Sequence, residues 1–384
     1  MRIGAALRRR RRLRTGLVQV VYIVGALGLG LLVPQISVGA TIESRRVTEM
    51  LVAVGAAFVP FIGIVYSLLF LVVQFGTTTF TPRLNLFRDS PIVWHGFSFF
   101  TGVIVFVFTA ALAIGKDAQT TLLVPIAVMV AILLAIAVFR RLQASAFRSI
   151  QLASTLAAVA RRGREVVDGM YPDPLGAGSA PDRGKTGPEN GRDVLWPSRG
   201  ATLQVIDVPR LVRAAERTGG VIEVCACPGE VIPEQGRVAI VHGGDESTER
   251  EAIGALQVGI ERTFDQDPGL ALRVLADIAL RSLSPAINDP TTAVQALDHV
   301  DGLLRVMMRR ELDVGTVIAE DARTRVLLRL PTWEDYVGVA LDETIAMSDR
   351  SLQVRRRVDR LLTELVAIAP PGRRECLQAR MERE

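Results

Sequence analysis

The sequence predicts a membrane protein in which four transmembrane α-helices are followed by a mixed α+β cytosolic domain, mainly helical at its C-terminal end. Three observations lead to this prediction. Long aliphatic runs fill most of the first third of the chain, and hydrophobic residues make up 49% of the whole sequence although aromatic residues make up only 5%. Arginines flank these runs mainly on one side. The rest of the chain alternates short strand and helix patterns with Gly and Pro.

Four apolar runs are each long enough to cross the hydrocarbon core of a bilayer, which is about 30 Å thick. A helix rises about 1.5 Å per residue, so about 20 residues suffice. Because the connections are short, neighbouring helices are expected to be antiparallel. No Asp, Glu, Lys or Arg lies inside a run, which argues against an ion-coupled transporter with a charge at mid-membrane. The runs cover residues 17–40, 50–75, 92–115 and 120–139.

The distribution of arginine predicts the orientation of the helices. Seven arginines crowd the N-terminal segment 1–16, and others follow the second and fourth runs. The opposite loops hold fewer basic residues, partly offset by Glu43, Glu49 and Asp117. Positive charge accumulates on the cytoplasmic side of membranes. Both termini are therefore predicted to be cytosolic, in a bacterial inner membrane, and the net charge of +5 requires no nucleic-acid partner.

The second run carries a polar stripe made of Gly63, Ser67 and Gln74, which Thr77 extends. The spacing of the first three residues places them within about 40° around a helix. One interpretation is a contact between helices in which Ser and Gln supply hydrogen bonds. The other is a pore or substrate face, which would need several copies of the chain because one set of four helices encloses little water.

In the loop after this run, Pro82 is expected to end or kink the helix. Arg83 and Arg88 follow at the predicted cytosolic surface. They are expected to contact lipid phosphates or acidic residues of the cytosolic domain.

Composition divides the chain into six parts. Residues Tyr171 to Asp193 are mainly Gly, Pro, Asp and Ser, which is typical of a flexible linker. The predicted parts are the basic N-terminus 1–16, the transmembrane domain 17–140, a connecting helix 141–170, the linker 171–194, a small α/β subdomain 195–248 and a helical subdomain 249–384.

Caps and hydrophobic periodicity predict the elements of the last two parts. Asp207 is expected to cap a helix that ends at Gly219, and Asp267 to cap a second helix. Asn288 or Asp289 is expected to cap a third helix, which starts at Pro290. Strands are predicted at 201–206, 221–226, 238–241 and 325–330, and helices at 249–264, 269–283, 333–348, 351–368 and 372–383.

The segment from Ser284 to Pro290 joins two predicted buried helices through a polar corner. Helix capping explains Asp289 and Pro290. Capping explains less well why further carboxylates and hydroxyls gather nearby, and such oxygen atoms could hold a hard cation or a polar ligand. The candidates for ligand or ion binding are Asp277, Ser284, Asn288, Asp289, Thr291, Thr292 and Asp298, with Arg262 and Asp267 as a second cluster.

Other chemistry has little support in the sequence. Cys225, Cys227 and Cys376 form no disulfide framework or metal motif, so we expect no metal site and no cofactor. His242 and His299 are not paired with a nucleophile, and the chain contains no phosphate loop or nucleophile elbow. These observations predict a protein that is not an enzyme.

Several segments of the sequence resemble a known family, the bacterial predicted membrane proteins grouped as domain of unknown function 2254. The resemblance implies a membrane location and this domain layout, and it implies no established chemistry. It is carried by Gln74 with Phe80-Thr81-Pro82-Arg83-Leu84, by Pro228-Gly229-Glu230-Val231, by Glu261-Arg262-Thr263 with Gln266-Asp267-Pro268, and above all by Asp277 to Pro290.

Two functions fit these expectations. The first is an oligomeric inner-membrane protein, channel-like or part of a transport system, which its cytosolic domain regulates through a small ion or ligand. The second is a membrane-anchored scaffold or ligand-sensing signalling protein without transport activity. Loss of ion flux on substitution of Ser67 or Gln74 would favour the first.

Overall fold

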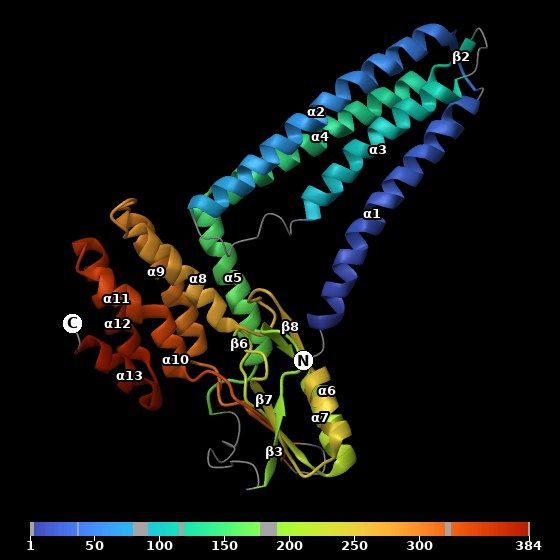
Figure 1. Ribbon diagram of the computed structural model, residues 1–384. Helices are drawn as coiled ribbons and strands as arrows, with labels where there is room; N and C mark the ends of the chain where they lie inside the picture. The colour runs from blue at the N-terminus through green and yellow to red at the C-terminus, as the bar shows by residue number, and fades with distance from the viewer. Residues whose placement is uncertain are drawn as a thin grey trace. The chain divides into compact units, whose positions relative to one another are not determined.

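The computed structural model describes residues 4–36, 38–79, 91–114, 119–176, 190–318 and 324–382 (Figure 1). The chain divides into two compact units. Ala6–Ser154 form the first, called here the helical bundle, and Thr155–Glu384 form most of the second, called here the mixed unit. Arg83 and Arg88 lie outside the described residues.

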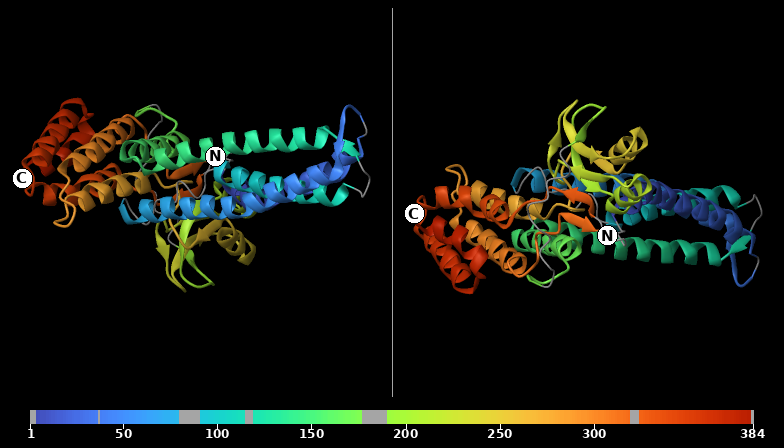
Figure 2. Two further views of the ribbon diagram at one scale, coloured as in Figure 1. Left: turned by 90° about the horizontal axis from the view of Figure 1, so that it is seen from above. Right: turned by 90° about the horizontal axis from the view of Figure 1, so that it is seen from below.

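The helical bundle contains α1 (Gly4–Leu32), α2 (Ser44–Thr79), α3 (Pro91–Ala113) and α4 (Leu123–Ile150). Within the described residues, these four helices are long and apolar enough to cross a membrane. In α3, half of the span His95–Ala113 is buried, compared with 17% or less of the spans in the other helices. The central position of α3 is visible in the views from above and below (Figure 2). The remaining helices therefore expose most of their apolar surface.

The first predicted run, 17–40, is only partly helical. The α-helix ends at Leu32 and a short 3-10 turn, η1 (Val33–Gln35), follows it. Pro34 accounts for the change, because its ring removes a backbone donor and clashes with the preceding turn. Residue 36 and residues 38–40 belong to a loop.

A two-stranded sheet joins two loops at one end of the bundle. Strand β1 (Thr41–Glu43) precedes α2, and strand β2 (Gln119–Thr121) precedes α4. The Thr41 hydroxyl donates to Gln119 Oε1 at 2.6 Å, and the Thr121 hydroxyl donates to the Val38 carbonyl at 3.0 Å. These contacts fix the starts of α2 and α4 side by side.

The mixed unit contains two sheets among its described residues. The first has the strand order β3-β7-β5-β10-β9, in which only β5 and β10 are parallel neighbours, and the second has the order β6-β4-β8. Helices α6 (Val208–Thr218) and α7 (Glu246–Gly254) contribute to the same hydrophobic core. The strands are β3 (Gly191–Leu195), β4 (Ala201–Ile206), β5 (Val221–Val224), β6 (Val231–Ile232), β7 (Arg237–His242), β8 (Leu256–Gly259), β9 (Thr316–Ile318) and β10 (Thr324–Leu328).

Helices form the rest of this unit. Helix α5 (Leu152–Met170) packs closely on it, since a Cβ atom added at Gly163 would lie 2.5 Å from Ala271 Cβ. The remaining helices are α8 (Pro268–Ser282), α9 (Pro290–Met307), α10 (Trp333–Val337), the π-helix η2 (Gly338–Asp342), α11 (Glu343–Ser348), α12 (Leu352–Ile368) and α13 (Pro371–Met381).

Two sequence predictions in this unit are wrong. The helix predicted at 249–264 ends at Gly254, and β8 follows it. Leu256 and Val258 alternate with Gln257 and Gly259, which is the period of a strand. The predicted linker 171–194 includes most of β3, which pairs with β7 although its composition is polar.

Candidate functional site

The polar corner between α8 and α9 is a helix N-cap. The Asp289 carboxylate accepts hydrogen bonds from the Thr292 N–H at 3.1 Å and from the Thr292 hydroxyl at 2.5 Å. These bonds, the hydroxyl bond first, hold the pKa of Asp289 below its ordinary value. Asn288 precedes the cap with a φ of 48°, a left-handed conformation that asparagine tolerates. Its N–H donates to the Ser284 carbonyl at 2.9 Å, so a backbone hydrogen bond within the corner holds this turn.

The two outlying carboxylates of this cluster have arginine partners. Asp277 pairs with Arg273 at 2.8 Å on α8. Asp298 pairs with Arg357 of α12 at 2.6 Å, and Arg357 also contacts Asp301. The Thr291 side chain is exposed. Among the described residues, no three His, Cys, Asp or Glu side chains are placed to share a metal ion.

The second predicted cluster is an ion pair between the half-buried Arg262 and the buried Asp267. Arg262 Nε donates to Asp267 Oδ2 at 2.7 Å, and Arg262 Nη2 donates to Oδ1 at 2.9 Å. Asp267 is only 4% exposed and also caps α8 by accepting from the Leu270 N–H at 3.0 Å. Burial raises the pKa of Asp267, and the bonds from Arg262 oppose that shift.

This ion pair belongs to a larger set of buried groups, which we call the buried polar centre. Tyr171, at the end of α5, and Tyr336 of α10 share a hydrogen bond of 2.9 Å between their hydroxyls. The backbone of Gly229, at a φ of 95°, lies so close that an added Cβ would meet Asp267 Oδ2 at 2.4 Å. The members are Tyr171, Cys227, Arg262, Asp267 and Tyr336.

The thiol and the phenols of the centre are held in their neutral forms. Desolvation is the main cause that raises the pKa of Cys227 to about 12 and that of Tyr171 to about 12. The Cys227 thiol donates to the Arg329 carbonyl at 2.8 Å. A nucleophilic cysteine needs a lowered pKa. The arrangement therefore supports structural hydrogen bonding and does not support thiolate chemistry.

The polar stripe of α2 is partly described. The Ser67 hydroxyl donates to the Gly63 carbonyl one turn earlier, at 3.0 Å. Both residues are exposed, and a Cβ atom added at Gly63 would meet nothing within 4 Å. Gln74 and Thr77 lie in the same helix, but their side chains are outside the described part of the chain.

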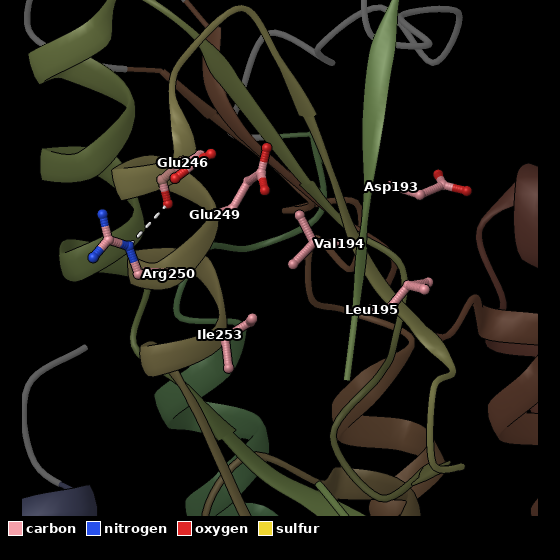
Figure 3. Close-up of a pocket in the computed structure, with 7 residues that line it drawn as sticks. All are labelled: Asp193, Val194, Leu195, Glu246, Glu249, Arg250 and Ile253. Carbon is pink, nitrogen blue, oxygen red and sulfur yellow. Dashed lines mark hydrogen bonds between the residues drawn. The ribbon is translucent and has the colours of Figure 1, made fainter. Parts of the chain in front are cut away.

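A shallow hollow lies between β3 and α7 (Figure 3). Three of its four charged side chains have partners: Glu249 pairs with Arg192 at 2.8 Å, and Asp193 lies 3.5 Å from Arg237. Arg250 Nε donates to the Glu246 carbonyl at 3.4 Å. We assign no ligand to this hollow.

Comparison with known proteins places the chain in a family. The model of the family described as "Predicted membrane protein (DUF2254)" matches residues 13–364. The chain belongs to this family. Relatives of this DUF2254 chain include the uncharacterized proteins Rv1290c of Mycobacterium tuberculosis (strain H37Rv) and Mb1321c of Mycobacterium bovis, each 26% identical over 369 residues. These alignments cover 86% of this chain and 66% of each relative, so the chain spans just under two thirds of their length. No solved structure matches the chain.

The buried polar centre was not predicted as a unit. Three sequence segments that carry the family resemblance meet there: the Pro228-Gly229 turn, Glu261-Arg262-Thr263 and Gln266-Asp267-Pro268. Two of its members, Arg262 and Asp267, were candidates. Tyr171 and Tyr336 were not, because a buried tyrosine far from its partner in sequence leaves no local pattern. The three segments that carry the family resemblance were the sequence signal that could have identified this centre.

Proposed function

We propose that this membrane protein lies in the bacterial inner membrane with both termini in the cytoplasm. Several copies assemble there into a channel-like or transport component, which the mixed unit regulates. The observation that carries the proposal is the exposed polar stripe of α2, Gly63 and Ser67. The proposal includes no catalytic step and no cofactor.

The interior of one bundle supports an assembly of several copies. Its two core clusters are built from hydrophobic side chains, including the fully buried Phe100 and its neighbours Phe58, Phe61 and Phe139. Phe61 contacts the rings of Phe100 and Phe139 at centroid distances of 5.7 and 5.3 Å. Within the described residues, these two clusters offer no polar path through a single chain. A water-filled path would therefore have to form between copies.

The outward face of α2 supplies polar groups for such a path. Ser67 and Gly63 are exposed among exposed apolar neighbours, of which Ile64 is 64% and Phe70 is 69% exposed. A small residue four positions from a serine allows two helices to approach closely in a membrane. The Ser67 oxygen keeps its lone pairs free to accept hydrogen bonds from water or from a second copy, because its proton is directed to Gly63.

The test is ion conductance of the purified protein in a planar bilayer, with Ser67→Leu as the variant. Thr101→Val is the matched control, because the Thr101 hydroxyl makes the same kind of bond to its own helix, to Phe97 at 3.1 Å, from the central helix α3. We expect a unitary current that Ser67→Leu abolishes and Thr101→Val retains. A silent bilayer with folded wild-type protein would contradict the proposal.

A second function is favoured by the polar corner. Asp289 and Thr292 serve as a helix cap, and Asp277 and Asp298 are paired with arginines. This use of the polar groups supports a membrane-anchored scaffold or sensor. A silent bilayer would favour that alternative, and ligand screening would then begin with the mixed unit.

A further inference from the structure

The two ends of the bundle differ in whether their described arginines pair with acidic residues. At the end that carries β1 and β2, Arg45 pairs with Glu49 at 2.9 Å and Arg46 pairs with Glu43 at 3.0 Å. Toward the opposite end, the side chains of Arg140 and Arg141 on α4 are exposed. Neither has an acidic partner within 4.0 Å among the described residues. Among the described arginines named here, the charge is therefore neutralised at one end and available at the other.

The position of this arginine pair along α4 matches the boundary of a bilayer. The apolar segment Leu123–Phe139 precedes it and is about 25 Å long at about 1.5 Å per residue. This length is close to the thickness of the hydrocarbon core, about 30 Å. The outward side chains of the segment are aliphatic, with Met129 at 57% and Leu133 at 59% exposure. The guanidinium groups can therefore reach the level of the headgroups.

The packing of the surrounding turn directs both arginines outward. Phe139 packs against the bundle core and Leu142 is only 2% exposed within it. These two residues flank the pair and hold this turn of α4 against the bundle. Arg140 and Arg141 consequently present two forked donor groups on the surface that faces lipid.

We propose that Arg140 and Arg141 bind the phosphate of an anionic phospholipid. The planar guanidinium group donates in pairs to phosphate oxygens. An anionic headgroup leaves the charge of its phosphate uncompensated, whereas a choline headgroup carries its own cation. Electrostatic attraction to an anionic membrane surface gives about a fivefold gain in affinity for each basic residue near it.

The test measures lipid adducts on the full-length protein by native mass spectrometry. Phosphatidylglycerol and phosphatidylcholine with the same acyl chains are titrated separately. We expect the wild type to bind phosphatidylglycerol more tightly than phosphatidylcholine. In the double variant Arg140→Gln and Arg141→Gln, that preference should fall by up to about fivefold for each arginine removed, the upper range for an exposed ion pair.

The matched control is the double variant Arg45→Gln and Arg46→Gln, which removes two exposed arginines that already have carboxylate partners. It should keep the wild-type preference. Equal affinity of the wild type for the two lipids, or an equal loss in both double variants, would overturn the proposal. Inorganic phosphate is titrated in parallel. Binding of phosphate alone at the lipid's affinity, lost in the Arg140 and Arg141 variant, would assign the site to a soluble anion instead.

Discussion

Individual side chains at the start of α9 show how a capping role can be separated from a binding role. Asp289 accepts two bonds from Thr292, whereas the neighbouring Thr291 side chain is exposed. Asp289, Thr291 and Thr292 were all candidates for the same predicted binding site. Capping requires Asp289 and Thr292, while a ligand at the corner would also contact exposed groups such as Thr291.

Asp289→Ala should lower the free energy of unfolding of the mixed unit by about 1 kcal/mol at neutral pH. The pKa of Asp289 in the folded state lies below its ordinary value of 3.8. Its contribution is therefore fully present above that value and is lost as the pH falls through the folded-state pKa. Urea unfolding at neutral and acidic pH measures the difference. Thr291→Ala should change stability little at either pH, and a larger loss for Thr291→Ala would count against simple capping.

At the level of elements, α5 shows how one glycine can fix the packing of a helix. Gly163 lies against Ala271 of α8 and Leu303 of α9, while Gly169 near the end of the same helix has no atom within 4 Å of an added Cβ. The two positions share a helix and differ in their surroundings. Alanine favours a helix over glycine by about 1 kcal/mol, so the two substitutions start from the same intrinsic gain.

Gly163→Ala should destabilise the mixed unit by about 1–2 kcal/mol, because overpacking outweighs the gain in helix propensity. The methyl group added at position 163 would lie 2.5 Å from the Cβ of Ala271, so Ala271 would have to move. Gly169→Ala should stabilise the unit by up to about 1 kcal/mol. Thermal unfolding of both variants measures whether each substitution raises or lowers the stability. A stabilising Gly163→Ala would show that α5 is not packed this tightly.

Local chemistry predicted many of these elements. Asp207 and Asp267 cap the helices that the sequence assigned to them, and Gly219 ends α6 in a left-handed conformation. Asp289, one of the two residues predicted as the cap of α9, is the one that caps it. Such signals lie within four residues of the helix end, so a sequence displays them directly. The strand β8 was misread as helix because its alternating pattern covers only four residues and follows directly on a helix.

At the scale of the whole molecule, each unit has a hydrophobic core of its own. The Arg262–Asp267 pair lies entirely within the mixed unit, and Trp196 and Trp333 are also buried there. A change in this pair should therefore affect one unit and leave the other unaltered. Tryptophan fluorescence mainly reports the mixed unit, and circular dichroism also reports the long helices of the bundle.

Asp267→Asn should lower the stability of the mixed unit by about 1–3 kcal/mol, because the neutral amide no longer compensates the charge of the half-buried Arg262. The fluorescence transition should move to lower temperature while the helical signal of the bundle persists. Asp349→Asn removes an exposed partner of Arg355 and should shift neither transition measurably. A single transition that moves as a whole would show that the two units unfold together.

The candidate site was less accessible to prediction than the fold. Tyr171 and Tyr336 are 165 positions apart in sequence, and their hydrogen bond depends on the complete packing of the mixed unit. Asp277 and Asp298 were grouped with the corner because they are near it in sequence. Their side chains instead follow the directions of α8 and α9 to arginines on other turns and helices.

The close packing of α5 against later helices also has a consequence for biosynthesis. Gly163 meets Leu303, which the ribosome adds 140 residues later. At about 5–20 residues per second, this delay is on the order of ten seconds. During that time the apolar residues of α5 that are buried in the folded protein, such as Leu156 and Val159, belong to a helix whose later packing partners are not yet made. A chaperone or the membrane surface would have to shield this newly made helix until α9 emerges.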